Sequence, residues 1–261
     1  MVPTNRTRPQ AGFSLVEMML VLVIFLVVSG AIFGLLNVAQ ARYRSEQEFV
    51  DTFQGTRLAI DQVSREIRMA GYPPPSSYAG PPFPVPADPL TAPPDWQRRF
   101  SVGFVGWPTQ SCTLGVTCAL PGGWDLVVEA DLDPEREIAA GPPLDPTEQV
   151  EWIRYVLVPD AGGQTSTLMR AVVPKVAGAD PIAATNAVLS PFVEGVLNQP
   201  GVVGDEIFRY VCEAGMAVCS PQNIVEVQIV VRARPMRRDI ETRQYREVTL
   251  QGVARRVNPY P

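Results

Sequence analysis

The N-terminal apolar segment constrains this chain more than any other feature of its 261 residues. No charged residue occurs from Met18 to Leu36, and a helix needs about 20 apolar residues to cross a hydrocarbon core. Arg6 and Arg8 precede the segment, so we expect the N-terminus in the cytoplasm and the C-terminal part in the periplasm. The segment is longer than the apolar core of a secretory signal, which spans about 7–15 residues. We therefore expect a single-pass helix in the inner membrane.

Glu17 lies at the entrance to this segment, with Val16 before it and Met18 after it. An ionised carboxylate within a bilayer is costly, by ~2.5 kcal/mol or more near the centre and by less towards the edge. Such a residue usually has a charged partner, although an acid at the membrane edge can also reach water. A positively charged partner for Glu17 therefore has to be identified.

The segment GFSLVEMMLVLVIF, residues 12–25, resembles the N-terminal motif of type IV pilins and pseudopilins. The resemblance implies that a prepilin peptidase cuts after Gly12, removes residues 1–12 as a leader peptide, and methylates the new N-terminal residue, Phe13. Glu17 is then the fifth residue of the mature chain, as in that family. The resemblance also implies a partner for Glu17, namely the N-terminal amine of Phe13 in an adjacent subunit. Glu17 would thus serve in subunit assembly.

Beyond the membrane segment, the apolar residues follow a helical period. A stripe with spacings of three and four residues predicts one buried helix face, and its members are Phe49, Phe53, Thr56, Ile60, Val63, Ile67 and Ala70. The charged residues, Glu66 among them, are expected mainly on the other faces. Gly71 and the prolines at 73–75 end the helix. We therefore expect a helix from Phe13 to about Ala70, with residues 13–40 in the membrane or a filament core and residues 41–71 amphipathic.

The pattern of short apolar runs in the remainder of the chain predicts a β-sheet. Residues 72–96 form a proline-rich linker, with ten prolines between Tyr72 and Pro94. Short apolar runs bounded by Pro, Gly and Asp follow in a globular domain of residues 97–261. The expected strands cover residues 100–107, 125–131, 150–158, 166–173, 206–212, 223–234 and 246–258. From Val225 to Arg232, apolar and polar residues mostly alternate, as in a half-buried antiparallel strand. A long N-terminal helix packed on a C-terminal antiparallel sheet is an α+β, pilin-like fold.

The end of the predicted helix, EIRMAGY at residues 66–72, resembles the PilW-type minor pilins. The succession D-x-V-V, I-x-Y-x-L and L-x-R, at residues 125–128, 153–157 and 168–170, recurs in PilW-like and J-type pseudopilin domains. The resemblance implies a minor pilin that takes part in assembly or initiation of a type IV pilus. Its partners would be the prepilin peptidase, other minor pilins and the major pilin. A J-type pseudopilin of a type II secretion system is the alternative, since the C-terminal RRVNPYP departs from the usual family ending.

The four cysteines form two close pairs, Cys112 with Cys118 and Cys212 with Cys219. An even number of cysteines in an exported domain predicts disulfides. Four cysteines allow three connectivities, of which we favour the two local bridges. Four free buried thiols would require the export prediction to be wrong.

Composition argues against catalysis and against several ligands. The chain has no histidine, which excludes Ser-His-Asp and Cys-His catalysis and His-ligated zinc. The acidic segment at residues 131–137 lacks the glycine and the glutamate of a calcium loop. The net charge of −5 argues against nucleic-acid binding. We expect no enzyme, no metal and no cofactor, while a membrane-tethered hydrolase or binding protein is a remote alternative.

Overall fold

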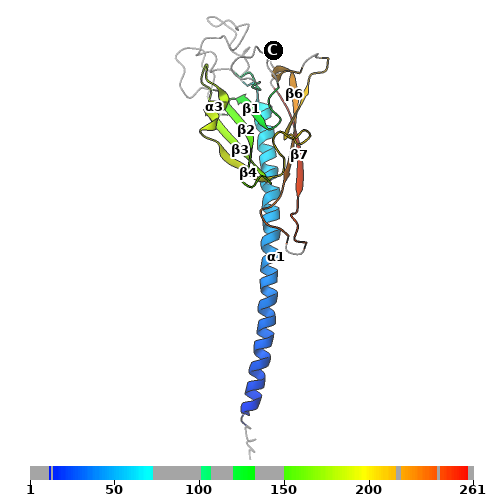
Figure 1. Cartoon of the computed structure of the whole chain (residues 1–261). Helices are drawn as coiled ribbons and strands as arrows, with labels where there is room; N and C mark the ends of the chain where they lie inside the picture. The colour runs from blue at the N-terminus through cyan, green and yellow to red at the C-terminus, as the bar shows by residue number, and fades with distance from the viewer. Residues whose placement is uncertain are drawn as a thin grey trace, which may run out of the picture.

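The computed structural model describes residues 12, 14–72, 101–106, 120–132, 150–215, 219–239 and 242–257. One helix, α1, runs without interruption over 55 residues, Leu15–Met69. Its N-terminal half projects away from the remainder of the molecule, and its C-terminal half lies against the strands (Figure 1). The predicted long helix is thus confirmed, and it ends one residue before the expected Ala70.

The predicted helical stripe packs on the sheet. Phe49 and Phe53 are partly buried, and from Thr56 onwards every stripe residue is buried. The stripe positions from Ile60 to Ala70 join a core with the inward side chains of the strands, such as Leu126, Tyr155 and Phe208. One expectation was wrong, because Glu66 is also buried. Glu66 lies at the margin of the stripe, where strand residues supply polar partners described below.

Within the described residues, seven antiparallel strands form one sheet in the order β1-β2-β3-β4-β6-β5, with β7 paired to β6. Figure 1 shows β1–β4 on one side of α1 and β6 and β7 on the other. The predicted α+β arrangement of a long helix on an antiparallel sheet is confirmed. The bounds are β1 Asp125–Ala130, β2 Glu151–Pro159, β3 Ser166–Pro174, β4 Ser190–Val196, β5 Phe208–Cys212, β6 Ile224–Ala233 and β7 Val248–Arg255, with a short helix α3 at Pro181–Asn186.

Two elements escaped prediction. β4 contains Pro191 and Gly195, residues that weaken a strand assignment because proline cannot donate to the ladder and glycine favours irregular backbone. The structure tolerates both because β4 pairs irregularly with β3, with register shifts between Ser166 and Met169. The helix α3 was also missed, and Asp180 caps it by accepting a hydrogen bond from the Ile182 amide at 3.0 Å.

Two strand predictions need correction. Described residues 101–106 of the predicted strand 100–107 form only an isolated bridge, Phe104 to Val128. Gly103 breaks the strand there with a φ of +88°, and a Cβ at this position would lie 2.7 Å from the Arg256 side chain. In β6, Val225 is exposed instead of buried, because a bulge opposite Val211 and Cys212 shifts the register and turns Ile224 inward.

The end of α1 is fixed to β1 through one buried serine. Ser101 Oγ accepts a hydrogen bond from the Gly71 amide at 3.0 Å and donates one to the Glu129 carbonyl. The same Gly71 amide also lies 3.2 Å from that carbonyl. Gly71 has a φ of +86°, a left-handed conformation that glycine adopts at low cost. The predicted stop at Gly71 is thus a turn bonded into the sheet. The boundaries of the linker at 72–96 lie largely outside the described residues.

Gly252 in β7 allows α1 to approach the sheet closely. A Cβ at this position would lie 2.4 Å from Cγ2 of Ile60, a β-branched side chain with little rotamer freedom. We expect Gly252→Ala to lower the free energy of unfolding by about 1–3 kcal/mol through overpacking. Gly162→Ala, at a turn where a Cβ meets no atom within 4 Å, is the matched control. Chemical denaturation of the detergent-solubilised chain measures both, and equal stability of the two variants would contradict this account.

Candidate functional site

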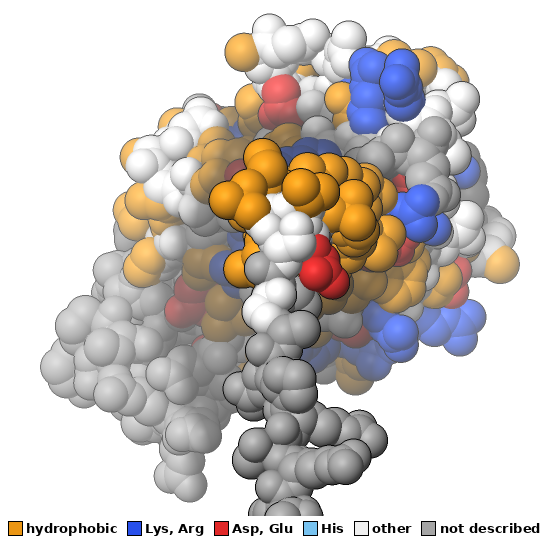
Figure 2. Space-filling view, turned by 90° about the horizontal axis from the view of Figure 1, so that it is seen from below, with side chains coloured by type: hydrophobic (Ala, Val, Ile, Leu, Met, Phe, Trp, Pro, Cys, Tyr) orange, Lys and Arg blue, Asp and Glu red, His pale blue; other side chains and the backbone are white. Residues whose placement is uncertain are grey.

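Glu17 lies in the first turn of α1, on the half of the helix that contacts nothing else in the described structure. The large apolar side chains from Leu15 to Val38 are 48–75% exposed. Figure 2, which looks from the N-terminal end of α1, shows hydrophobic side chains gathered over this end of the helix. Gly12 is exposed and would accept a Cβ without contact, while Phe13 lies outside the described residues. The roles of Gly12 and Phe13 in cleavage, of Phe13 in methylation and of Glu17 in assembly therefore stay predictions.

The same half of α1 has the properties of a membrane anchor. α1 contains an 18-residue window with a mean hydropathy of 2.9 and none of its residues buried, near the N-terminus. By length and composition α1 can cross a membrane. An apolar surface of this extent is unfavourable in water, so this half of α1 requires lipid or other apolar helices around it.

Glu66 connects the other half of α1 to the sheet through a buried ionic contact. Arg170 on β3 donates from Nη2 to Glu66 Oε1 at 2.6 Å, and its Nε lies 3.2 Å from the Tyr155 hydroxyl. The Tyr155 hydroxyl on β2 donates to Glu66 Oε2. One carboxylate on the helix therefore binds two neighbouring strands at once. Both strand residues belong to the I-x-Y-x-L and L-x-R patterns, which the structure brings together with the EIRMAGY segment.

The environment of this cluster keeps Tyr155 and Arg170 protonated. Burial, and then the negative charge of Glu66, raise the pKa of Tyr155 above its usual range. Its hydroxyl therefore stays a donor at all ordinary pH values. Burial lowers the pKa of Arg170, but the hydrogen bond and charge of Glu66 outweigh burial and raise this pKa overall. Tyr155 and Arg170 therefore both act as hydrogen-bond donors to Glu66.

Glu129 on β1 forms a second buried cluster with Lys175, the only lysine of the chain. Glu129 Oε2 accepts from Lys175 Nζ at 2.8 Å and from the Val102 amide at 2.9 Å. Its Oε1 accepts from Trp152 Nε1 at 2.9 Å. A buried ion pair needs this many additional donors to offset the desolvation of both charges. The cluster fixes the segment around Val102 against β1, next to the end of α1.

A third polar contact orders the short helix α3. Arg154 on β2 binds Asp125 with two parallel hydrogen bonds, Nε to Oδ1 at 2.8 Å and Nη2 to Oδ2 at 2.7 Å. Its Nη1 also donates to Asn186 Oδ1 at 2.6 Å, at the end of α3. Asp125 is the acid of the D-x-V-V pattern, so this residue also has a structural partner. Sequence reasoning did not identify Arg154, Glu129 or Lys175, because a single charged residue in a strand, or directly after one as Lys175 is, does not reveal its partner across the sheet.

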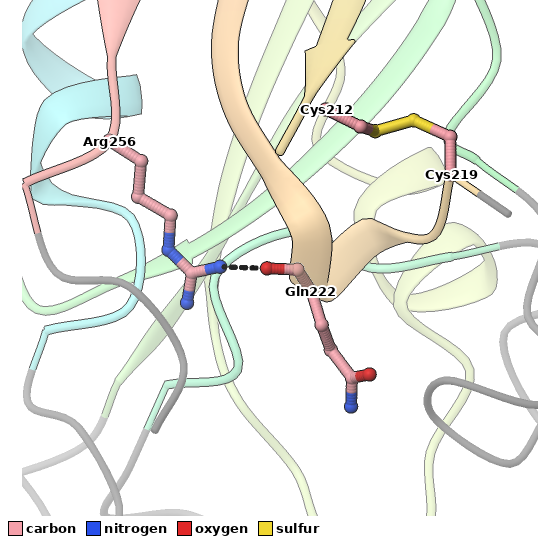
Figure 3. The surroundings of a disulfide bond; sticks show 4 residues. All are labelled: Cys212, Cys219, Gln222 and Arg256. Carbon is pink, nitrogen blue, oxygen red and sulfur yellow. Dashed lines mark hydrogen bonds between the residues drawn. A yellow bond between two sulfur atoms is a disulfide. The ribbon is translucent and has the colours of Figure 1, made fainter. Parts of the chain in front are cut away.

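Cys212 and Cys219 form a disulfide across the β5–β6 connection, with their Cα atoms 5.7 Å apart (Figure 3). Beyond this bridge, Arg256 donates from Nη1 to the Gln222 carbonyl at 3.4 Å (Figure 3). Its Nη2 donates to the Val102 carbonyl at 3.2 Å. Arg256 therefore joins the turn after the disulfide to the segment of Gly103. Cys112 and Cys118 lie outside the described residues, and their pairing stays a prediction.

Comparison with known proteins finds one match. Residues 7–33 match the model of the prokaryotic N-terminal methylation motif. No curated protein and no solved structure matches the chain. The matched residues contain Gly12, Phe13 and Glu17, and the motif supports a type IV pilin or pseudopilin family protein.

The methylation motif indicates how the protein is processed and where it is located. The motif implies processing by a prepilin peptidase and contact with a pilus assembly machinery. Together with the exposed apolar half of α1, it fits a membrane-anchored pilin. It also suggests a structural protein rather than an enzyme. Within the part of the chain that the structure describes, no three His, Cys, Asp or Glu side chains gather into a metal site.

We expect Glu66→Ala to lower the free energy of unfolding by about 3 kcal/mol, because it leaves the Arg170 guanidinium and the Tyr155 hydroxyl without their shared acceptor. Asp61→Ala is the matched control, since Asp61 is an exposed acid on the same helix and such surface changes cost at most about 0.5 kcal/mol. Chemical denaturation, followed by tryptophan fluorescence, compares the two variants. A Glu66→Ala chain as stable as the Asp61→Ala chain would show that this cluster does not hold α1 on the sheet.

Proposed function

We propose that the chain is a PilW-like minor pilin that takes part in the assembly or initiation of a type IV pilus, with the pilus tip as one location. The observation that carries the proposal is the position of Glu17, which lies in the first turn of an apolar helix half that lacks any contact with the remainder of the described chain. A carboxylate there requires a positive partner when the helix is surrounded by lipid or by other helices. Cleavage after Gly12 would create such a partner, the amine of Phe13.

The proposed mechanism depends on a partner from another subunit. In this proposal the partner comes from another subunit, and Glu17 has no ion-pair partner among the described residues. A contact between the Glu17 carboxylate of one subunit and the Phe13 amine of the next would neutralise both charges. The contact would also set the axial register of adjacent helices, because a wrong register leaves both charges unpaired in an apolar environment.

The minor pilin subtype is supported by the segment at residues 66–72 and by the strand patterns that meet it. Glu66 binds Tyr155 and Arg170, and Gly71 forms the turn that is bonded to Ser101. The residues of the PilW-like resemblance thus work together at the junction of helix and sheet. The second candidate, a J-type pseudopilin, shares the strand patterns. Neighbouring genes for pilus assembly favour the first candidate, and neighbouring genes for type II secretion favour the second.

Processing can be tested by mass spectrometry of the membrane form in a strain with active prepilin peptidase. We expect loss of residues 1–12 and one added methyl group on Phe13. Gly12→Val should block both changes, because the Gly at the end of the leader is the cleavage position. An intact leader on the unmodified chain would refute the assignment to this class of protein.

We expect Glu17→Ala to leave the chain inserted in the membrane but to impair its co-purification with other pilins and to lower the number of pili. Removing a charge makes insertion easier, so a loss of assembly with normal insertion isolates the role of the carboxylate. Asp61→Ala again serves as the control for a general loss of acidic charge. Normal piliation and co-purification of Glu17→Ala would remove Glu17 from the mechanism.

A further inference from the structure

A groove of about 240 Å³ lies between α1 and the two groups of strands. Its floor is α1 from Asp51 to Thr56, one wall is β4 from Phe192 to Gly195, and the other wall includes Arg234 and Met236, which follow β6. β4 and β6 belong to groups of strands on opposite sides of α1 (Figure 1). The groove is therefore a gap in the sheet above the helix.

The backbone edge of β4 is open along this groove. β4 pairs with β3 along one edge, but on its other edge the only pair with β6 among the described residues is Val196 with Ala233. The Arg234 amide donates to the Gly195 carbonyl at 3.0 Å and closes the groove at this end. Gly195 permits this approach, because a Cβ there would lie 2.4 Å from the Arg234 carbonyl oxygen and its φ is +69°. From Pro191 to Glu194 the edge has no strand partner among the described residues. An open edge offers hydrogen bonds to polypeptide main chain.

Gly55, on the floor of the groove, has no role in the packing of the described chain. A Cβ at this position would meet no atom within 4 Å, so no close approach within the molecule requires glycine. Glycine in a helix interior costs about 1 kcal/mol relative to alanine. Gly55 therefore leaves the helix backbone open on the floor of the groove, where an outside group can approach it.

The rim of the groove defines the chemistry of an occupant. Asp51 and Glu194 are exposed carboxylates without an ion-pair partner in the described chain. Arg234 is stacked on the Tyr245 ring, with its guanidinium carbon 4.1 Å from the ring centroid. Met236 is 68% exposed, although it is a large apolar side chain. The rim therefore suits an extended peptide that presents one apolar and one basic side chain.

We propose that the groove holds an extended segment of a neighbouring pilin-like subunit. Its main chain pairs with the open edge of β4, its apolar side chain lies over Gly55 beside Met236, and its basic side chain meets Asp51 and Glu194. The source of the segment rests on the proposed function, which supplies neighbouring subunits beside α1. The groove itself rests only on the edge, the glycine and the rim.

The test fills the groove with a larger side chain and measures crosslinking to the partner. Gly55→Leu directs its side chain over the preceding turn, which is Asp51 and Thr52, and so into the groove. Because leucine is a better helix former than glycine, this variant should unfold at the same temperature as the wild type or a higher one. Gln54→Leu adds the same side chain at an exposed neighbouring position outside the groove lining and is the matched control. Each is combined with the photo-crosslinking residue p-benzoylphenylalanine at Met236 in the full-length chain, in cells that assemble pili.

We expect the Met236 probe to crosslink to another pilin-like subunit, with the crosslink retained in Gln54→Leu and lost in Gly55→Leu. Gly55→Ala gives a second, smaller filling that should lower the crosslink without affecting folding. A crosslink of unchanged yield in a folded Gly55→Leu chain would overturn the proposal, as would a crosslink to lipid or to no molecule. Co-purification of the wild type with other pilins separates the two hypotheses. If the wild type associates and the filled groove changes nothing, only the groove proposal fails, whereas a wild type that never associates refutes the proposed function.

Discussion

The buried contact of Glu66 with Tyr155 and Arg170 is the interaction that fixes the axial position of α1 on the sheet. An apolar stripe alone holds a helix on a sheet without fixing its axial position, since neighbouring apolar residues can replace one another at modest cost. A shift of α1 by one residue would move Glu66 by about 1.5 Å along the axis and about 100° around it. Both strand partners would then lose their acceptor. The ionic contact therefore selects one register of α1 on the sheet, which the apolar stripe supports.

This register matters because α1 is continuous. No proline interrupts Leu15–Met69, so the position of the sheet at one end is coupled to the position of Glu17 at the other. In a membrane-anchored pilin, an intersubunit contact at the first turn would then also set where each globular domain lies relative to its neighbours. The polar contacts concentrate at the sheet end: Ser101 at the helix terminus, Glu129 with Lys175 beside it, and Glu66 one turn before. The other end of the helix bears only an apolar surface and one acid.

The sequence could predict those elements whose signal is local. The stripe from Phe49 to Ala70 has a helical period, and Gly71 before three prolines marks an end. In the hairpin of β2 and β3, a turn that contains Asp160, Gly162 and Gly163 separates two segments rich in β-branched and aromatic residues. The resemblance at residues 12–25 pointed to the same motif that the comparison matched at residues 7–33. What escaped prediction depends on distant partners. Glu66 is buried because of residues 89 and 104 positions away, β4 exists despite Pro191 and Gly195 because β3 pairs with it, and Val225 faces outward because of a bulge set by the opposite strand.

The division of charge along α1 also explains why acids can have opposite roles in one helix. Glu66 obtains its partners when the chain folds, so its burial contributes to folding and limits the positions that the sheet can take. Glu17 has no ion-pair partner among the described residues, so its desolvation in an apolar environment is unfavourable unless a positive charge meets it, which the proposed assembly would supply from a second chain. The first acid selects a conformation, and the second would select an assembly. The same physical rule, that a buried carboxylate requires a paired donor, acts within the subunit at one end of the helix and, in the proposed assembly, would act between subunits at the other.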